Sequence, residues 1–140
     1  MFVTVFFAHY QVRTGELIFA NAGHNPPYIV RADGAVTSLG EATGTILGVF
    51  PEAAFEDGRA SLAPGDLLAA YTDGVTEAAD TEGLLFGEER LEKLLSEIHA
   101  QPVEAIRRRI LDEVTAYRQG QDQDDVTVLV LKRNAIGPSQ

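Results

Sequence analysis

Short runs of apolar and β-branched residues, separated by turn residues, occupy the first 40 positions of the chain. Residues 2–12 are rich in Val, Phe, Thr and Tyr, Thr14-Gly15 interrupts them, and residues 16–20 resume the pattern. Residues 28–30 and 35–39 flank an Asp-Gly turn in the same way. Two apolar runs around a tight turn are typical of a β-hairpin, so this region predicts two hairpins.

The middle of the chain continues with strands and turns. Glycines recur within residues 40–50 and predict a loop with one short apolar turn, and residues 55–62 predict another strand. Pro64-Gly65 indicates a tight turn. The apolar run at 66–71 is shorter than a typical helix and has turn residues on both sides, so we expect a buried strand.

Apolar residues recur at helical spacing after Phe86. One apolar stripe, within residues 87–99, consists of Leu91, Leu94, Leu95 and Ile98. A second helix begins at Pro102 and is closed by Gly120, and its stripe consists of Val103, Ile106, Ile110, Val114 and Tyr117. The β-branched run at 126–131 predicts a final strand. Many strands, two adjacent helices and one more strand predict an α+β fold with helices packed on a sheet.

Composition narrows the class of protein. The chain has 140 residues, 45% of them hydrophobic and 23% charged, as expected for one globular domain or a large part of one. Its 11 basic and 21 acidic residues give a net charge of −10, which disfavours nucleic acid as a partner and suits either a cation site or simple solubility. No cysteine is present and no apolar run is long enough to span a membrane, so we expect a cytoplasmic protein without disulfides or thiolate metal sites.

Acidic residues occur at the ends of two expected strands. Asp73 and Gly74 follow the buried strand, where Asp73 is either a ligand at the rim of the sheet or part of a plain Asp-Gly turn. Asp124 and Asp125 precede the last strand, and adjacent side chains point to opposite faces, so only one of them can face a given site. If the two strands are antiparallel neighbours, Asp73 and one of this pair reach the same rim and offer oxygen ligands to Mg²⁺ or Mn²⁺.

The remaining candidate residues and motifs support few other functions. His24 lies in a loop with glycine and proline that could shape a pocket. No serine has a His-Asp arrangement near it, and no GxxxxGK[ST] phosphate loop occurs. A phosphatase resembling the haloacid dehalogenases would need a nucleophilic aspartate two positions before Asp73, where Tyr71 stands.

Five ordered sequence blocks together resemble one family. They are "MFVT" at 1–4, "ANAGHNPP" at 20–27, "YTDGVTEA" at 71–78, "FGEERL" at 86–91 and "DDVTVLVLK" at 124–132. The family is the bacterial branch of the PPM (PP2C-type) metal-dependent serine/threonine phosphatases, which includes stage II sporulation protein E and regulators of sigma factors. The resemblance implies that residues 1–133 form the C-terminal part of such a phosphatase domain and that 134–140 are a polar tail.

The resemblance implies a PP2C-like β-sandwich flanked by α-helices, with two Mn²⁺ or Mg²⁺ ions at one end. A metal-activated water then hydrolyses phosphoserine or phosphothreonine, with no phosphoenzyme. Asp73 and Asp124 match metal ligands of the family, with Gly74, Asp125 and Thr127 beside them. The implied partner is a phosphorylated protein substrate, such as the antagonist of an anti-sigma factor, in sigma-factor or stress-response regulation.

One family motif does not occur in the chain. The family begins its metal site with "GDVSGxG", upstream of the block matched by 1–4, so we expect the first third of the domain to be absent and the fold to be incomplete at the N-terminus. At most one weak metal site is then expected, and the alternative function is an inactive protein-binding module of the same fold. We also expect uncovered apolar surface on the sheet and on helices 87–99 and 102–118, an open strand edge, and self-association.

Overall fold

The computed structural model of the chain describes residues 3–40, 57–121 and 124–134. Its strands are β1 (Val5–Tyr10), β2 (Glu16–Ala22), β3 (Tyr28–Val30), β4 (Val36–Ser38), β5 (Gly58–Ser61), β6 (Leu67–Tyr71) and β7 (Val128–Lys132). Its helices are α1 (Asp73–Thr76), α2 (Gly87–Ile98) and α3 (Val103–Arg118). Both hairpins, the buried strand before Asp73 and the two long helices are thereby confirmed, whereas most of the loop expected at 40–50 lies outside the described residues.

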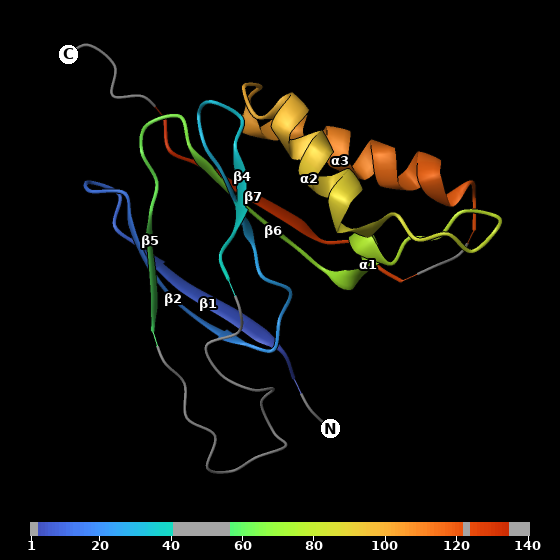
Figure 1. The fold of residues 1–140 in the computed structure, drawn as a ribbon, viewed down its shortest axis with the longest axis horizontal. Coiled ribbons are helices and arrows are strands. Elements are labelled where there is room, and N and C mark those ends of the chain that lie inside the picture. Colours follow the sequence, from blue (N-terminus) through green and yellow to red (C-terminus); the bar gives the residue numbers. More distant parts are fainter. Residues whose placement is uncertain (1–2, 41–56, 122–123, 135–140) are drawn as a thin grey trace.

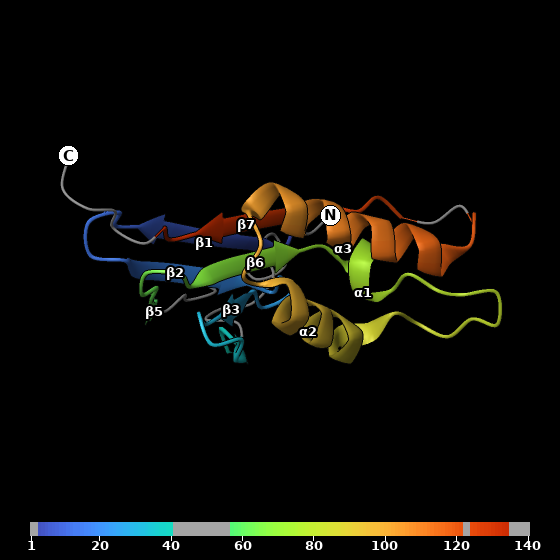
Figure 2. The ribbon, with the colours of Figure 1, turned by 90° about the horizontal axis from the view of Figure 1, so that it is seen from above.

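Two antiparallel sheets and one layer of helices build the fold (Figures 1 and 2). The three-stranded sheet has the order β1-β2-β5, and the four-stranded sheet has the order β4-β3-β6-β7. Helices α2 and α3 cover the face of the four-stranded sheet that points away from the other sheet (Figure 1). The α+β sandwich expected from the sequence is therefore present.

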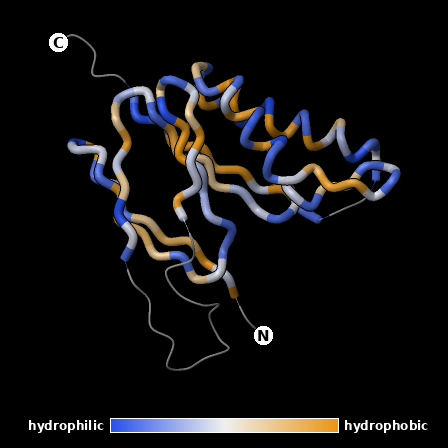
Figure 3. Tube along the Cα trace, in the orientation of Figure 1, coloured by the Kyte–Doolittle hydropathy of each residue, from blue (hydrophilic) through white to orange (hydrophobic). Residues whose placement is uncertain are grey.

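The side chains of the central strands point alternately to the two faces of the sheet and thereby form two separate parts of the core. In β3, Tyr28 and Val30 pack toward the helices, whereas Ile29 packs toward the three-stranded sheet. Figure 3 shows the corresponding hydrophobic colour along the strands and the alternating colour along the helices. Side chains of successive residues in a strand point to opposite faces, so a sheet covered on both sides needs such a continuous apolar run.

The apolar stripes of both long helices are buried. Of the residues expected in the stripes, the buried ones are Leu91, Leu94, Leu95, Ile98, Ile106, Ile110 and Val114. The expectation that these helix faces lack a cover is therefore wrong, because the four-stranded sheet supplies it. Only the first residue of the second stripe, Val103, is largely exposed, at 40%.

The outer surface of the sandwich does expose apolar side chains. In the described part of the chain β1 and β7 are edge strands, and Figure 2 shows them along the same side of the two layers. Phe7 in β1 is 68% exposed and Leu129 in β7 is 56% exposed. The expected open edges and uncovered apolar surface are thus confirmed for the strands.

A buried carboxylate ties the second hairpin to the turn before β6. The Oδ2 atom of Asp66 accepts hydrogen bonds from Arg31 Nη1 and the Ala63 amide, and Oδ1 accepts one from the Ala32 amide, each at 2.8–2.9 Å. Burial by itself raises the pKa of the Asp66 carboxyl, but these hydrogen bonds together outweigh it and hold the pKa below its usual value.

Candidate metal centre

Antiparallel pairing of β6 with β7 brings the acidic residues to one rim of the sheet. Tyr71 pairs with Val128, and the next pair outward is joined by a 3.1 Å hydrogen bond from the Thr72 amide to the Thr127 carbonyl oxygen. Asp73 continues from one strand and Asp125 and Asp124 precede the other. The sequence-based interpretation of neighbouring strands with acidic ends is therefore confirmed.

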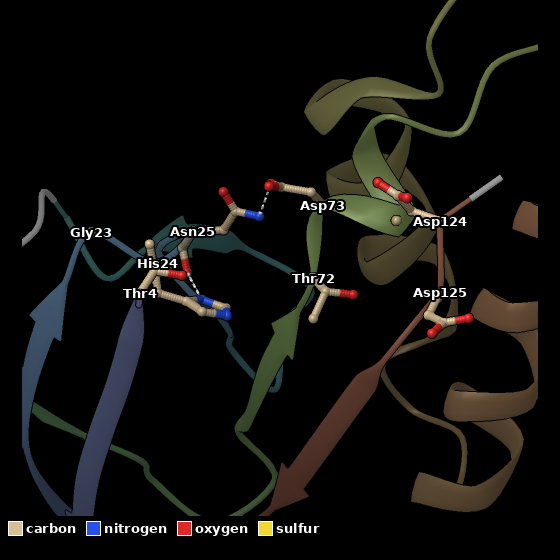
Figure 4. A pocket seen from close by; sticks show the side chains of 9 residues that line it. Thr4, Gly23, His24, Asn25, Thr72, Asp73, Asp124 and Asp125 are labelled. Carbon is tan, nitrogen blue, oxygen red and sulfur yellow. Dashed lines mark hydrogen bonds between the residues drawn. The ribbon is translucent and has the colours of Figure 1, made fainter. Parts of the chain in front are cut away.

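The rim encloses a pocket of about 430 Å³ (Figure 4). It is lined by Thr4, Gly23, His24, Asn25, Thr72, Asp73, Gly74, Asp124 and Asp125. The pocket therefore contains the expected pair Asp73 and Asp124, together with Gly74, Asp125 and the histidine expected to shape a pocket. Of the residues proposed around the site, only Thr127 does not line it.

Thr127 instead supports the rim through its backbone. Its amide donates a 3.0 Å hydrogen bond to Thr72 Oγ1, and its carbonyl accepts the Thr72 amide. Because a side-chain hydroxyl replaces one backbone group in this pair, the regular ladder stops here. The last strand consequently begins at Val128 and not at Val126, as the sequence pattern predicts.

Asp73 opens a short helix that the sequence pattern does not predict. Residues Asp73–Thr76 form α1, in which the Glu77 amide donates to the Asp73 carbonyl oxygen at 2.8 Å. The carboxylate itself is exposed and accepts a 2.6 Å hydrogen bond at Oδ1 from Asn25 Nδ2. The Asp-Gly pair therefore both turns the chain and presents the carboxylate, so the two interpretations of Asp73 are compatible.

The loop that carries Asn25 is held by a buried asparagine. The Asn21 side chain is 1% exposed; its Oδ1 accepts the His24 amide at 2.8 Å and its Nδ2 donates to the His24 carbonyl oxygen at 2.9 Å. Gly23, between them, has a φ of 77°, which glycine adopts without strain. Sequence reasoning missed both asparagines, although the block "ANAGHNPP" that contains them was among the family signals.

Gly74 is required by the close approach of two backbone segments. A Cβ atom at this position would lie 2.1 Å from the Asp125 carbonyl oxygen and 3.3 Å from that of Asp124. Atoms of adjacent segments do not approach to 2.1 Å, so no larger residue fits without displacement. Gly74 is not among the glycines with a positive φ, so the close approach of the two segments is what requires a glycine here.

The two neighbouring aspartates point in different directions. Figure 4 shows the Asp124 carboxylate beside α1 and the Asp125 carboxylate turned away from it. Both residues line the pocket, so their different directions exclude neither of them from it. Arg118, at the end of α3, contacts the same segment, because its Nη2 donates to the carbonyl oxygens of Asp124 at 2.6 Å and Gly74 at 3.1 Å.

The donor set fits a hard divalent cation in kind. Carboxylate oxygens suit Mg²⁺ and Mn²⁺, and Asp73 and Asp124 each bring one carboxylate to the same pocket. Within the described residues, however, no group of three or more His, Asp or Glu side chains is arranged to hold an ion. The two aspartates would hold a cation only with water or with donors from elsewhere completing its coordination.

A buried tyrosine pair lies directly behind the rim. Tyr71, the last residue of β6, stacks on Tyr28 with ring centroids 5.6 Å apart. Burial raises the pKa of both phenols, and the Glu92 carboxylate on α2 adds to the increase. Both hydroxyls therefore stay protonated and can donate hydrogen bonds at neutral pH.

Solved structures with the same architecture are phosphatase domains. The phosphatase domain of the Bacillus subtilis cell fate determinant SpoIIE matches 98% of this chain with a TM-score of 0.77 and 22% identity, over 61% of its own length. The RsbU and RsbW domains of a Mycobacterium tuberculosis protein match 96% of this chain with a TM-score of 0.79 and 28% identity, over 37% of that chain. The fold is thus that of PP2C-type phosphatase domains.

Sequence comparison gives the family. The family model described as stage II sporulation protein E (SpoIIE) matches residues 1–134, and the chain belongs to this family. It is 34% identical to Protein IcfG of Synechocystis over 135 residues and 31% identical to the phosphoserine phosphatase RsbU of Bacillus subtilis over 134 residues. The matches cover 96% and 95% of this chain but only 21% and 39% of those two proteins. The chain therefore spans less than half the length of either relative.

Among the described residues no helix is both long and apolar enough to cross a membrane.

Proposed function

We propose that residues 1–133 are the C-terminal part of a metal-dependent protein serine/threonine phosphatase domain. The observation that carries the proposal is the joint position of Asp73 and Asp124 in one pocket at the β6–β7 rim. Two facts add support: the chain belongs to the SpoIIE family, and one relative is named a phosphoserine phosphatase. Mn²⁺ or Mg²⁺ ions bound at the complete site would lower the pKa of a bound water and neutralise the charge of the phosphoryl group.

Each residue of the rim has a distinct part in this proposal. Asp73 and Asp124 supply oxygen ligands, and the hydrogen bond from Asn25 Nδ2 to Asp73 Oδ1 orients the Asp73 carboxylate at the pocket. Gly74 lets the segment that contains Asp124 approach α1. The hydrogen bond from the Thr127 amide to Thr72 Oγ1 fixes the start of β7, which follows that segment in the chain. The remaining ligands come from outside this donor set, which limits the chain alone to at most one weak site.

The substrate we propose is a phosphorylated protein in sigma-factor or stress-response regulation, such as the antagonist of an anti-sigma factor, in the cytoplasm. The likeness to a solved structure that contains RsbU and RsbW domains supports this choice. The exposed apolar residues on the β1 and β7 edges support self-association as a further property of the isolated chain.

A second candidate function is a catalytically inactive protein-binding module of the same fold. It is favoured by the lack of a third ligating side chain among the described residues. The two candidates differ in one measurable property, since only the first requires that a divalent cation bind at the rim and that phosphoserine be hydrolysed.

Calorimetric titration with Mn²⁺ tests the metal site. We expect weak, millimolar-range binding to the wild-type chain, because two carboxylates leave most of the coordination to water. Asp73→Asn and Asp124→Asn should each weaken binding about fivefold or more, which corresponds to about 1 kcal/mol. Asp112→Asn, an exposed acid on α3, is the matched control and should leave the affinity unchanged.

Two results would separate the candidates. Wild-type affinity retained in both Asp73→Asn and Asp124→Asn, or no binding to the wild-type chain at millimolar Mn²⁺, would exclude the proposed site. Mn²⁺-dependent release of phosphate from a phosphoserine peptide, abolished in both variants, would exclude the inactive module.

A further inference from the structure

Arg118 joins the two acidic segments of the rim. Its Nη2 donates to the Gly74 carbonyl oxygen at 3.1 Å and to the Asp124 carbonyl oxygen at 2.6 Å. Gly74 directly follows Asp73 in the chain. One guanidinium nitrogen is therefore bonded to the backbone of both segments that carry the proposed ligands.

The contacts of this guanidinium group are with carbonyl oxygens and not with carboxylates. Among the ion pairs of the described residues, none joins Arg118 to an acidic side chain. A guanidinium group paired with the carboxylate of Asp73 or Asp124 would compete directly with Mn²⁺ for that carboxylate. Bonding to the carbonyl groups instead fixes the segments while both carboxylates stay available to a metal ion.

The end of α3 gives this side chain a rigid base. The helix is anchored by the buried residues Ile106, Ile110 and Val114. It stops directly after Arg118, because Gln119 takes a left-handed conformation with φ of 53° and its amide donates to the Ala116 carbonyl oxygen. A left-handed residue other than glycine is uncommon, so the position at which α3 ends is well defined.

We propose that Arg118 is a positioning residue of the metal site, which holds the Asp73 and Asp124 segments at their ligating separation before a cation binds. The proposal rests on the proposed function for the identity of the site. It adds that the C-terminal end of α3 is part of the site's support. Such support matters because ligating groups must be held within a fraction of an ångström of their working geometry.

The change in affinity for Mn²⁺ after removal of the Arg118 guanidinium group distinguishes a positioning role from a purely electrostatic one. A positive charge near the rim repels a divalent cation, so its removal alone would raise the affinity for Mn²⁺. Loss of the two carbonyl contacts lets the segments separate and lowers the affinity. A fall in affinity after removal of the guanidinium group is therefore specific to the positioning role.

The test uses Arg118→Met, which keeps the aliphatic stem and removes the donors, with Arg108→Met as the matched control. Arg108 is an exposed arginine on the same helix. In metal-free protein we expect the backbone amide NMR signals of residues 73–75 and 124–127 to shift in Arg118→Met and to stay in place in the control. We expect the affinity for Mn²⁺, measured by paramagnetic broadening, to fall at least threefold, and Arg118→Lys to recover part of it.

Unshifted amides in Arg118→Met, or an affinity for Mn²⁺ equal to or above that of the wild-type chain, would overturn the proposal. Proton exchange of the guanidinium groups in the wild-type chain gives a check that needs no variant. The Arg118 protons should exchange more slowly than those of Arg108, and equal rates would also overturn it. If the wild-type chain binds no Mn²⁺, the proposed function fails, while the positioning of the two segments is still decided by the amide shifts and the exchange rates.

Discussion

Replacement of Gly74 by alanine has two opposite effects on the free energy of unfolding. Within a helix, alanine is favoured over glycine by about 1 kcal/mol, so propensity alone predicts a more stable protein. The added Cβ, however, would lie 2.1 Å from the Asp125 carbonyl oxygen and 2.8 Å from its carbonyl carbon, whereas ordinary contact begins at 3.4 Å. Both contacts are with backbone atoms, which cannot rotate out of the way.

The size of the overlap sets the expected loss. The Asp125 carbonyl must retreat by about 1 Å, and an insertion of this kind into a packed site costs about 1–3 kcal/mol. After the gain in helix propensity is subtracted, we expect Gly74→Ala to lower the free energy of unfolding by up to about 2 kcal/mol. The retreating segment also carries Asp124, so the affinity for Mn²⁺ should fall as well.

Urea unfolding and amide NMR measure these two consequences. The control is Gly83→Ala, since Gly83 has a φ of 85° but no atom lies within 4 Å of its added Cβ. The control should lose about 1 kcal/mol through left-handed strain alone, without movement of the Asp124 and Asp125 signals. A Gly74→Ala protein at least as stable as the wild type, with those signals unmoved, would refute the inferred close approach.

Two further substitutions probe the supports of the fold and the loop. Asp66→Asn should lower the free energy of unfolding by about 2 kcal/mol at pH 7, because the amide nitrogen that replaces one oxygen cannot accept from the donors facing it. The folded-state pKa of Asp66 lies below its unfolded value of about 3.9, so the carboxylate's contribution is complete above that pH and is lost as the pH falls through the folded pKa. The difference in urea unfolding between wild type and variant should therefore begin to shrink below about pH 4 and go on shrinking as the pH falls, and a constant difference down to pH 2, or an equal loss in Asp112→Asn at pH 7, would contradict this account. Asn21→Ala should cost about 2 kcal/mol and speed hydrogen exchange of the His24 amide, because two groups of the His24 backbone lose their partner; unchanged exchange would show that the loop does not depend on Asn21.

Local patterns were sufficient for most elements of the fold. The apolar runs at 16–20 and 66–71 predict β2 and β6, and helical spacing predicts α2 and α3, because each element must bury apolar side chains. The covering of the helices was not predicted correctly. An upstream part of the domain was expected to cover the two stripes, whereas the four-stranded sheet, assembled from segments far apart in the sequence, already covers both.

The candidate site could be predicted only where it follows from strand adjacency. If the strands at 66–71 and 126–131 were antiparallel neighbours, Asp73 and Asp124 or Asp125 were expected on one rim, and the pairing of β6 with β7 meets that condition. The hydrogen bond from Asn25 to Asp73 joins residues 48 positions apart and depends on the pairing of β3 with β6. No sequence pattern specified that pairing, and the same limit applies to the contact of Arg118 with Gly74, which joins residues 44 positions apart.

The contacts of the rim explain how two like charges are held at one sheet end. Asp73 and Asp124 repel each other in a chain that already carries a net charge of −10, so the acids themselves do not assemble the site. Assembly comes from contacts of the backbone: the β6–β7 ladder, the close approach at Gly74 and the hydrogen bonds from Arg118 to two carbonyl oxygens. If this is correct, Asp124→Asn should weaken Mn²⁺ binding and leave the free energy of unfolding unchanged or higher, because the contacts that hold the segment involve its backbone. A marked loss of stability in the same variant would show instead that the carboxylate contributes to the fold.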